Sequence, residues 1–183
     1  MLVFVTGVAG SGKSTLCTEL SSRGHAAHDA DDGISRHVSI VDGAEAPTPP
    51  RVQQTPEWVA RHEFRFDLEK VADLAATATA DRPAFLLGAA YGDDAVIHLA
   101  NQAWYLHLGE PELRRRIASR PPDAYGQAPH ELESILAWHA ASADRYEALG
   151  ARRIDASRPV DELADELLAA LLTENPPGQR NLP

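Results

Sequence analysis

The chain has 183 residues, 44% hydrophobic and 24% charged, which is enough to bury the core of a soluble domain. Its formal net charge of −10 argues against a nucleic-acid backbone or an anionic membrane as the main partner, although a local group of arginines could still bind a small anion. A single cysteine, Cys17, excludes an internal disulfide and fits a cytoplasmic protein, and no apolar run approaches the roughly 18 residues of a membrane span.

The first predicted element is a buried parallel strand over Leu2–Val5, and not a signal peptide, since no basic segment precedes it. Directly after it comes the pattern G-x-x-x-x-G-K-[ST], followed by a predicted helix over 14–23. In this pattern backbone N–H groups wrap around a polyphosphate, the lysine reaches the β- and γ-phosphates, and the Ser/Thr hydroxyl ligates Mg²⁺. We therefore expect ATP to bind the phosphate loop, which consists of Gly7, Val8, Ala9, Gly10, Ser11, Gly12, Lys13, Ser14 and Thr15.

Short apolar runs alternate with helical patterns along the rest of the chain, as is typical of a parallel sheet covered by helices on both faces. Further strands are predicted at 25–28, 84–87, 103–108 and 152–154. Helices are predicted at 57–80, 110–119, 130–149 and 160–172, with Thr55-Pro56 as a start signal and Asp93 or Asp94 capping a shorter helix. The interpretation is one α/β domain over 1–174 and a flexible tail over 175–183.

Acidic residues follow the second predicted strand, where the carboxyl ends of parallel strands gather ligands. Asp29 and Asp31 are two residues apart, so in an extended segment both side chains face the same substrate. One carboxylate beside a bound triphosphate can hold Mg²⁺, and another can accept a proton from an attacking hydroxyl. A purely structural reading, with a capping aspartate and solvated acids, is the alternative.

A basic segment follows the fourth predicted strand. Arg116 and Arg120 are four residues apart on the predicted helix and share a face, so both can reach one polyphosphate. Arginine forks can offset the charge that develops on γ-phosphate oxygens during transfer. The prolines and the glycine just downstream predict a hinged cover, a lid at about 116–128.

In order along the chain, the phosphate loop, the Asp-x-Asp segment and the arginine-rich helix resemble the small P-loop kinases, among them shikimate, gluconate, adenylylsulfate, dephospho-coenzyme A and nucleoside monophosphate kinases. The resemblance implies a three-layer P-loop NTPase fold with a five-stranded parallel sheet in the order 2-3-1-4-5. It also implies that Asp31 engages the acceptor hydroxyl, that Ser14 and Asp29 hold the magnesium, and that Ser157 and Arg158 lie beside the adenine.

The resemblance places the acceptor-binding region at about 32–80. Arg61 and Arg65, one predicted helical turn apart with Trp58 nearby, are the candidates for binding an anionic or aromatic acceptor, although surface arginines and a core tryptophan explain them equally well. Shikimate kinases carry three glycines after the third strand, whereas this chain has Gly88-Ala89-Ala90, so no single member's acceptor transfers to it.

The leading hypothesis is an Mg²⁺-dependent phosphotransferase that uses ATP and a small-molecule or nucleotide acceptor, as a monomer or a homodimer. A GTPase switch would need an Asn-Lys-x-Asp segment, which the sequence lacks, and a motor ATPase would need an acid where the third strand ends in Gly88. A non-catalytic ATP-binding module stays open as well. His139, with Asp144 and Glu147, fits a solvated helix face.

Overall fold

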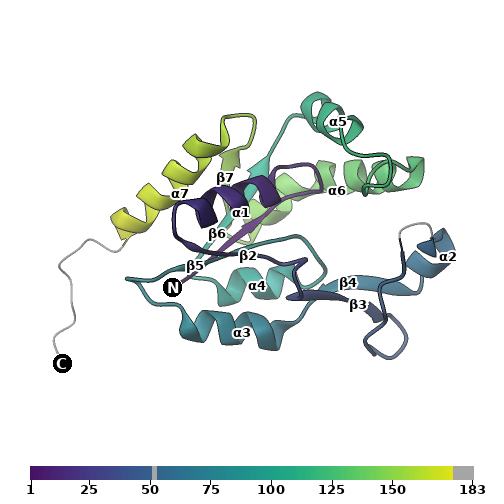
Figure 1. Cartoon of the computed structure of the whole chain (residues 1–183), viewed down its shortest axis with the longest axis horizontal. Coiled ribbons are helices and arrows are strands. Elements are labelled where there is room, and N and C mark those ends of the chain that lie inside the picture. The colour runs from purple at the N-terminus through teal and green to yellow at the C-terminus, as the bar shows by residue number, and fades with distance from the viewer. Residues whose placement is uncertain (51–52, 175–183) are drawn as a thin grey trace.

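The computed structural model describes residues 1–50 and 53–174, and its centre is a parallel sheet of five strands (Figure 1). The strands are β1 (Leu2–Thr6), β2 (Ala26–Asp29), β5 (Ala84–Leu87), β6 (Gln102–His107) and β7 (Arg152–Asp155). They lie in the order β2-β5-β1-β6-β7, and every neighbouring pair is parallel. In terms of the five predicted strands this is the order 2-3-1-4-5, so the predicted fold class is confirmed.

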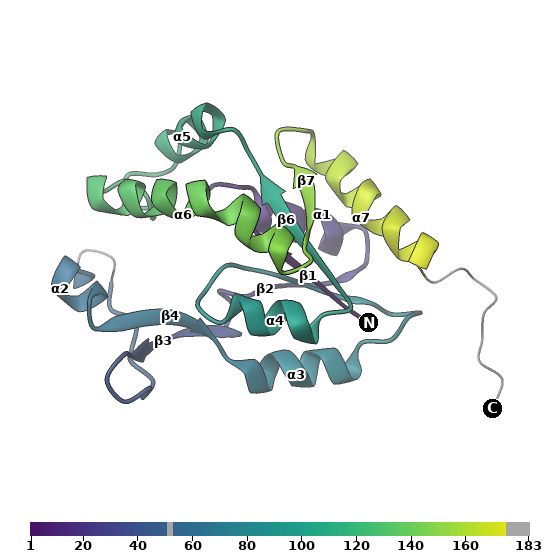
Figure 2. The same cartoon turned by 180° about the vertical axis from the view of Figure 1, so that it is seen from behind.

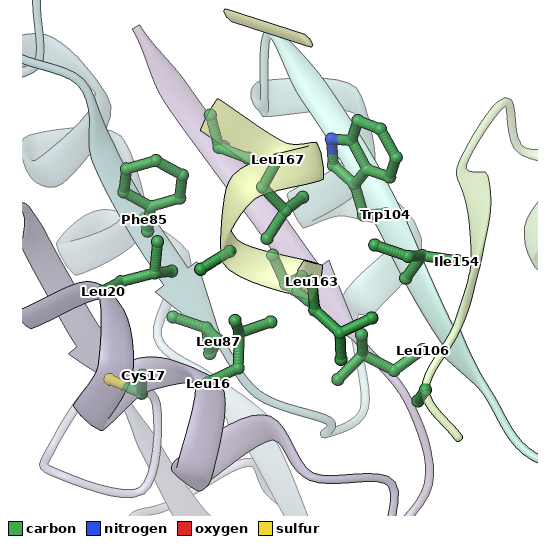
Figure 3. Close-up of a cluster of buried hydrophobic side chains, with 14 of the residues drawn as sticks. Leu16, Cys17, Leu20, Phe85, Leu87, Trp104, Leu106, Ile154, Leu163 and Leu167 are labelled. Carbon is green, nitrogen blue, oxygen red and sulfur yellow. The ribbon is translucent and has the colours of Figure 1, made fainter. Parts of the chain in front are cut away.

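Helices cover both faces of the sheet because successive residues of its inner strands point to opposite sides, and both sides are apolar. One face packs against α1 (Lys13–Ser22) and α7 (Val160–Glu174), through the side chains drawn in Figure 3. The other face packs against α3 (Leu68–Thr77), α4 (Asp93–Leu99) and the C-terminal half of α6 (Pro129–Ala148), which lie in front of the sheet in Figure 2. This sandwich fixes the carboxyl ends of β1, β2, β5 and β6 side by side.

The segment predicted as one helix over 57–80 is instead three elements, so that prediction was wrong. It contains a short helix α2 (Pro56–Val59), a strand β4 (His62–Phe66) and α3. The alternation His-Glu-Phe-Arg-Phe has the period of two that suits a strand, and it pairs antiparallel with β3 (Ser35–Ser39). Asp67 then starts α3, because its side chain accepts a hydrogen bond from the Lys70 N–H.

We call β3, β4 and α2 together the hairpin. It joins the main sheet through the segment after β5, where the Tyr91 N–H donates to Phe64 O at 2.8 Å and the Phe66 N–H donates to Tyr91 O at 3.1 Å. In Figure 1 it extends from the same end of the molecule as the N-terminal half of α6 and the loop between α5 (Glu110–Ala118) and α6. The hairpin therefore occupies the predicted acceptor region.

No helix within 1–50 and 53–174 has the length and apolarity to cross a bilayer. The predicted tail over 175–183 lies outside the described residues. The prediction of a single domain over 1–174 is not tested by these observations and stays a prediction.

Candidate active site

The phosphate loop connects β1 to α1, and its geometry depends on a glycine at its start. A Cβ atom on Gly7 would lie 2.7 Å from Ser11 Oγ and 3.0 Å from the carbonyl oxygen of Leu106, which is too close for any side chain. Ser11 Oγ is buried and has no hydrogen-bond partner among the described residues. A cradle without side chains and a buried hydroxyl without a partner fit a bound phosphate group.

Lys13 stands at the first position of α1, and its ammonium folds back over the loop. Its Nζ donates to Gly7 O at 2.6 Å and to Val8 O at 3.1 Å. Burial lowers the pKa of Lys13 to about 8, although the carboxylates of Asp31 and Asp29 act in the opposite direction, and the Arg120 guanidinium lowers it further. The structure thus brings Lys13, Asp29, Asp31 and Arg120 within electrostatic reach of one another.

Asp29 and Asp31 have different environments at the end of β2. The Ser14 hydroxyl donates to Asp29 Oδ2 at 2.8 Å, and the Asp31 N–H donates to Asp29 Oδ1 at 3.1 Å. Burial raises the pKa of Asp31, the Asp29 carboxylate adds to the rise, and the Lys13 ammonium opposes it. A hydroxyl beside a carboxylate offers the hard oxygen ligands that Mg²⁺ prefers, so Ser14 and Asp29 fit the predicted metal site.

The position of the acidic loop depends on Gly88, the residue that follows β5. A Cβ atom there would lie 2.3 Å from the Cβ of Ala30 and 3.4 Å from the ring of Phe66. Ala30 is also tied to the strand end, because its N–H donates to Leu87 O at 2.8 Å. Close packing of Ala30 on Gly88 therefore determines where the next residue, Asp31, can stand.

Arg116 and Arg120 contact different partners. The Arg116 guanidinium is paired with Glu112 at 2.8 Å, and it donates to the carbonyls of Ser11 at 3.4 Å and Ala156 at 2.9 Å. It therefore joins the phosphate loop to the segment after β7. Arg120 donates to the Tyr125 carbonyl at 2.8 Å, inside the predicted lid. That loop is also tied to α5, where Gln127 Nε2 donates to Ile117 O at 2.6 Å.

Ser157 and Arg158, predicted to lie beside the adenine, follow β7. The Ser157 N–H donates to Asp155 Oδ1 at 2.9 Å. The Arg158 guanidinium turns toward α7, where it pairs with Glu162 at 3.1 Å and with Glu166. Contact between the adenine and these two residues stays a prediction, and Arg158 would have to leave its acidic partners to make it.

Arg61 and Arg65 are not one helical turn apart, because no helix spans them. Arg65 lies on β4 and donates through Nε to Glu63 at 2.6 Å, whereas Arg61 lies in the exposed turn between α2 and β4. The two arginines predicted to bind the substrate therefore do not share a helix face, because the second of them lies on a strand that the helical interpretation missed.

Sequence reasoning also missed a buried ion pair beside the site. Asp93, predicted only as a possible cap, is 2% exposed and accepts two hydrogen bonds from Arg145 at 2.7 and 3.0 Å and a third from the Tyr146 hydroxyl. It anchors α6 to the segment after β5. His139 is buried against the His107 ring, with centroids 5.5 Å apart, so its placement on a solvated face was wrong.

A polar groove of about 500 Å³ runs between α1 and β2, starting at Ser14 and Asp29. It continues along Thr18 and Ser21 of α1 and reaches Asp32 at its other wall. The groove opens on the side of the predicted magnesium site, and Ser14 is the residue of the phosphate loop that lines it.

Known structures share this architecture, whereas neither a scan against protein families nor a search of curated proteins finds a match. A shikimate kinase from Acinetobacter baumannii is similar with a TM-score of 0.61 and 15% identity, over 96% of this chain and 94% of that one. A gluconokinase from Sinorhizobium meliloti 1021 gives 0.55 and 19%, over 94% and 91%. A deoxyadenosine kinase from M. mycoides gives 0.53 and 12%, over 96% and 100%. At these identities the likeness shows the P-loop kinase-like fold.

Proposed function

We propose that this chain is an ATP-dependent kinase that transfers the γ-phosphate to a hydroxyl group of a small-molecule acceptor. The observation that carries the proposal is the cluster of Lys13, Asp29, Asp31 and Arg120 at the mouth of the phosphate loop. A triphosphate bound there would have cationic groups on two sides and a carboxylate of raised pKa beside its terminal phosphate. The kinase names of the structural neighbours agree with this reading.

Each of these residues has a distinct role in the proposed reaction. The loop N–H groups and Lys13 bind the phosphates, and Arg120 offsets the charge that develops on the transferred group. Asp31 orients the acceptor hydroxyl and accepts its proton. The acceptor oxygen forms a bond to the γ-phosphorus, the bond to the bridging oxygen breaks, and ADP leaves with the electron pair.

Ser14 and Asp29 would hold Mg²⁺, which when bound neutralises charge on the phosphate oxygens. In the described structure the two groups hydrogen-bond to each other at 2.8 Å, so metal binding would replace that contact. Arg116 positions the site, because it ties the phosphate loop to the segment after β7.

A screen for phosphate transfer from ATP to nucleosides, nucleotides, sugar acids, polyols and antibiotics tests the proposal. Lys13→Ala should abolish transfer. Asp31→Asn should lower kcat by about 10² to 10⁴ while ATP affinity changes only a few-fold. Asp32→Asn removes the neighbouring exposed carboxylate and serves as the matched control. Tight ATP binding with no transfer to any acceptor class would overturn the proposal.

A further inference from the structure

The hairpin carries a continuous row of rings on one face. Register pairs His37 with Phe64 and Ser39 with His62, and these residues share the face on which Phe66 lies. The His37 ring centroid is 4.9 Å from Phe64 and 4.8 Å from Trp58, and Trp58 stacks on His62 at 4.3 Å. We call Phe64, His37, Trp58 and His62 the ring row. All four side chains are only partly buried.

The ring row begins beside the candidate catalytic carboxylate. Phe66, which precedes it on the same hairpin face, packs edge-on against Phe4 in the core, with centroids 5.6 Å apart. The Phe66 ring also borders Gly88, whose other neighbour is Ala30, the residue before Asp31. The row therefore leads outward from the position where an acceptor hydroxyl would meet the γ-phosphate.

The distribution of aromatic side chains over the whole fold supports a ligand role. Of the eleven Phe, Trp and Tyr residues, six are buried in the two core clusters. The other five all belong to segments at the carboxyl end of the sheet or to the hairpin attached there (Figure 1). They are Trp58, Phe64, Tyr91, Tyr125 and Trp138. Partly exposed aromatic surface is thus concentrated around the acceptor region.

Helix α6 adds to this arrangement. Trp138 and Arg145 are seven residues apart and share a face of the helix. Arg145 reaches Asp93, the first residue of α4, at the carboxyl edge of the sheet. Trp138 therefore lies two helical turns closer to the lid, on the face of α6 that is turned toward this edge.

The charges on the two paired strands of the hairpin favour an uncharged acceptor, while Arg61 lies outside these strands, in the exposed turn between α2 and β4. Arg36 pairs with Asp67 at 2.8 Å and with Glu45 at 3.5 Å, and Arg65 pairs with Glu63. Carboxylates therefore neutralise both guanidiniums of the paired strands. A carboxylate or phosphate on the acceptor would have to displace these partners, whereas a neutral ring would not.

From these observations we infer that the acceptor is an uncharged nucleoside, whose base stacks on the ring row while a ribose hydroxyl meets Asp31. The inference rests on the proposed kinase function and names its substrate class. Flat bases bind aromatic side chains through their π-faces, with little dependence on which base is present. Of the two acceptor types that the acceptor region could take, anionic and aromatic, the ring row and the paired arginines select the aromatic one.

The ring row also helps to hold α2 on the hairpin, so variants must separate stacking on a ligand from packing within the protein. Trp58 provides this separation, because Trp58→Phe keeps a flat ring on α2 whereas Trp58→Leu keeps only apolar volume. Tyr91→Ala is the matched variant on the other side. Tyr91 is 60% exposed and pairs in parallel with Arg65, so its ring lies on the face of β4 opposite to Phe64.

The test measures ADP release and the phosphorylated product with uncharged nucleosides, with ribose and glycerol, with gluconate, and with nucleoside monophosphates. Nucleosides should give a kcat/KM at least about tenfold above every other class. Trp58→Leu should raise the KM for the nucleoside about tenfold and leave the KM for ATP within twofold, whereas Trp58→Phe and Tyr91→Ala should leave both constants near those of the wild type. Leu99→Ala, an exposed apolar residue on α4, is the control and should change neither constant.

Binding without turnover is followed by tryptophan emission during nucleoside titration, which should quench in the wild type and respond less in Trp58→Leu. Preferred turnover of a ringless or anionic acceptor overturns the inference and leaves the kinase function standing. Preference for a polyol would point instead to the polar groove between α1 and β2. An unchanged KM for the nucleoside in Trp58→Leu also overturns the inference. Quenching by nucleosides without transfer to any acceptor would overturn the kinase function, and of the inference only nucleoside binding at the ring row would remain. Neither quenching nor transfer would overturn both.

Discussion

Raising the pH from 7 to 9.5 should weaken ATP binding, because Lys13 loses its proton within that range. Burial lowers the pKa of Lys13 to about 8 in the free protein, whereas contact with a triphosphate favours the ammonium form and raises it. At pH 7 about nine-tenths of the free protein carries the charge, and at pH 9 about one-tenth does. Apparent affinity should therefore fall about tenfold between pH 7 and 9, and about thirtyfold by pH 9.5.

Isothermal titration with a non-hydrolysable ATP analogue measures this effect. Experiments in two buffers of different ionisation enthalpy should also show uptake of about half a proton per ligand at pH 8. The terminal phosphate has its second pKa at about 6, so it gains little further charge above pH 7. Cys17, whose pKa is raised by burial, is checked with Cys17→Ala, which should reproduce the wild-type curve.

A guanidinium keeps its charge throughout, so any residual binding by Lys13→Arg should be independent of pH. Constant wild-type affinity from pH 7 to 9.5, without proton uptake, would show that Lys13 is fully protonated in the free protein. In that case burial of the ammonium would not be the dominant influence on this site.

Three further changes have predictable outcomes. Gly88→Ala should destabilise the protein by about 1–3 kcal/mol and lower turnover more than tenfold, because the new Cβ collides with Ala30. Thermal melts measure the stability and initial rates measure the turnover. Wild-type rates would refute the role of Gly88 in positioning Asp31. Asp93→Asn should lower the free energy of unfolding, measured in urea, by about 3 kcal/mol. This is the low end for a broken buried ion pair, because 41% of the Arg145 side chain is exposed. A loss below about 1 kcal/mol would contradict the stabilising role of the Asp93–Arg145 pair. Burial and the neighbouring Arg153 and His139 lower the pKa of His107, so its neutral form stabilises the fold fully above about pH 6.5, and this contribution is lost as the pH falls through the lowered pKa. The unfolding free energy of the wild type should thus fall more between pH 7.5 and 5 than that of His107→Gln, and equal losses would argue against it.

The half of the molecule that carries the phosphate loop could be predicted from the sequence because its signals are local. The phosphate loop is one continuous motif, and parallel strands bring the residues at their carboxyl ends to a common edge, so Asp29 and Asp31 meet Lys13 although they stand far apart in the sequence. Arg120 joins them because the helix after β6 ends at the same edge.

The acceptor half could not be predicted in the same way, because its strands depend on contacts that are distant in the sequence. Five residues of β4 fit a helical period when they are read inside a longer window, and only pairing with β3 and the backbone bonds to Tyr91 make them a strand. The sequence around Asp93 indicates only an ordinary helix start, because its partner Arg145 stands 52 residues further along the chain. In the sequence, His139 is grouped with Asp144 and Glu147 further along the same helix, yet its ring meets His107 of the sheet.

The attachment of the hairpin has a consequence for how such proteins could diversify. The hairpin joins the main sheet mainly through the backbone at Tyr91, the ring of Phe66 and the bond from the Ser35 N–H to Ala30 O at 2.7 Å. Backbone bonds do not depend on side-chain identity, so most residues of the hairpin could be exchanged without loss of these bonds. A different insert that kept these few junctions could change which small molecule the site binds while the phosphate loop, Asp31 and Arg120 remained as they are.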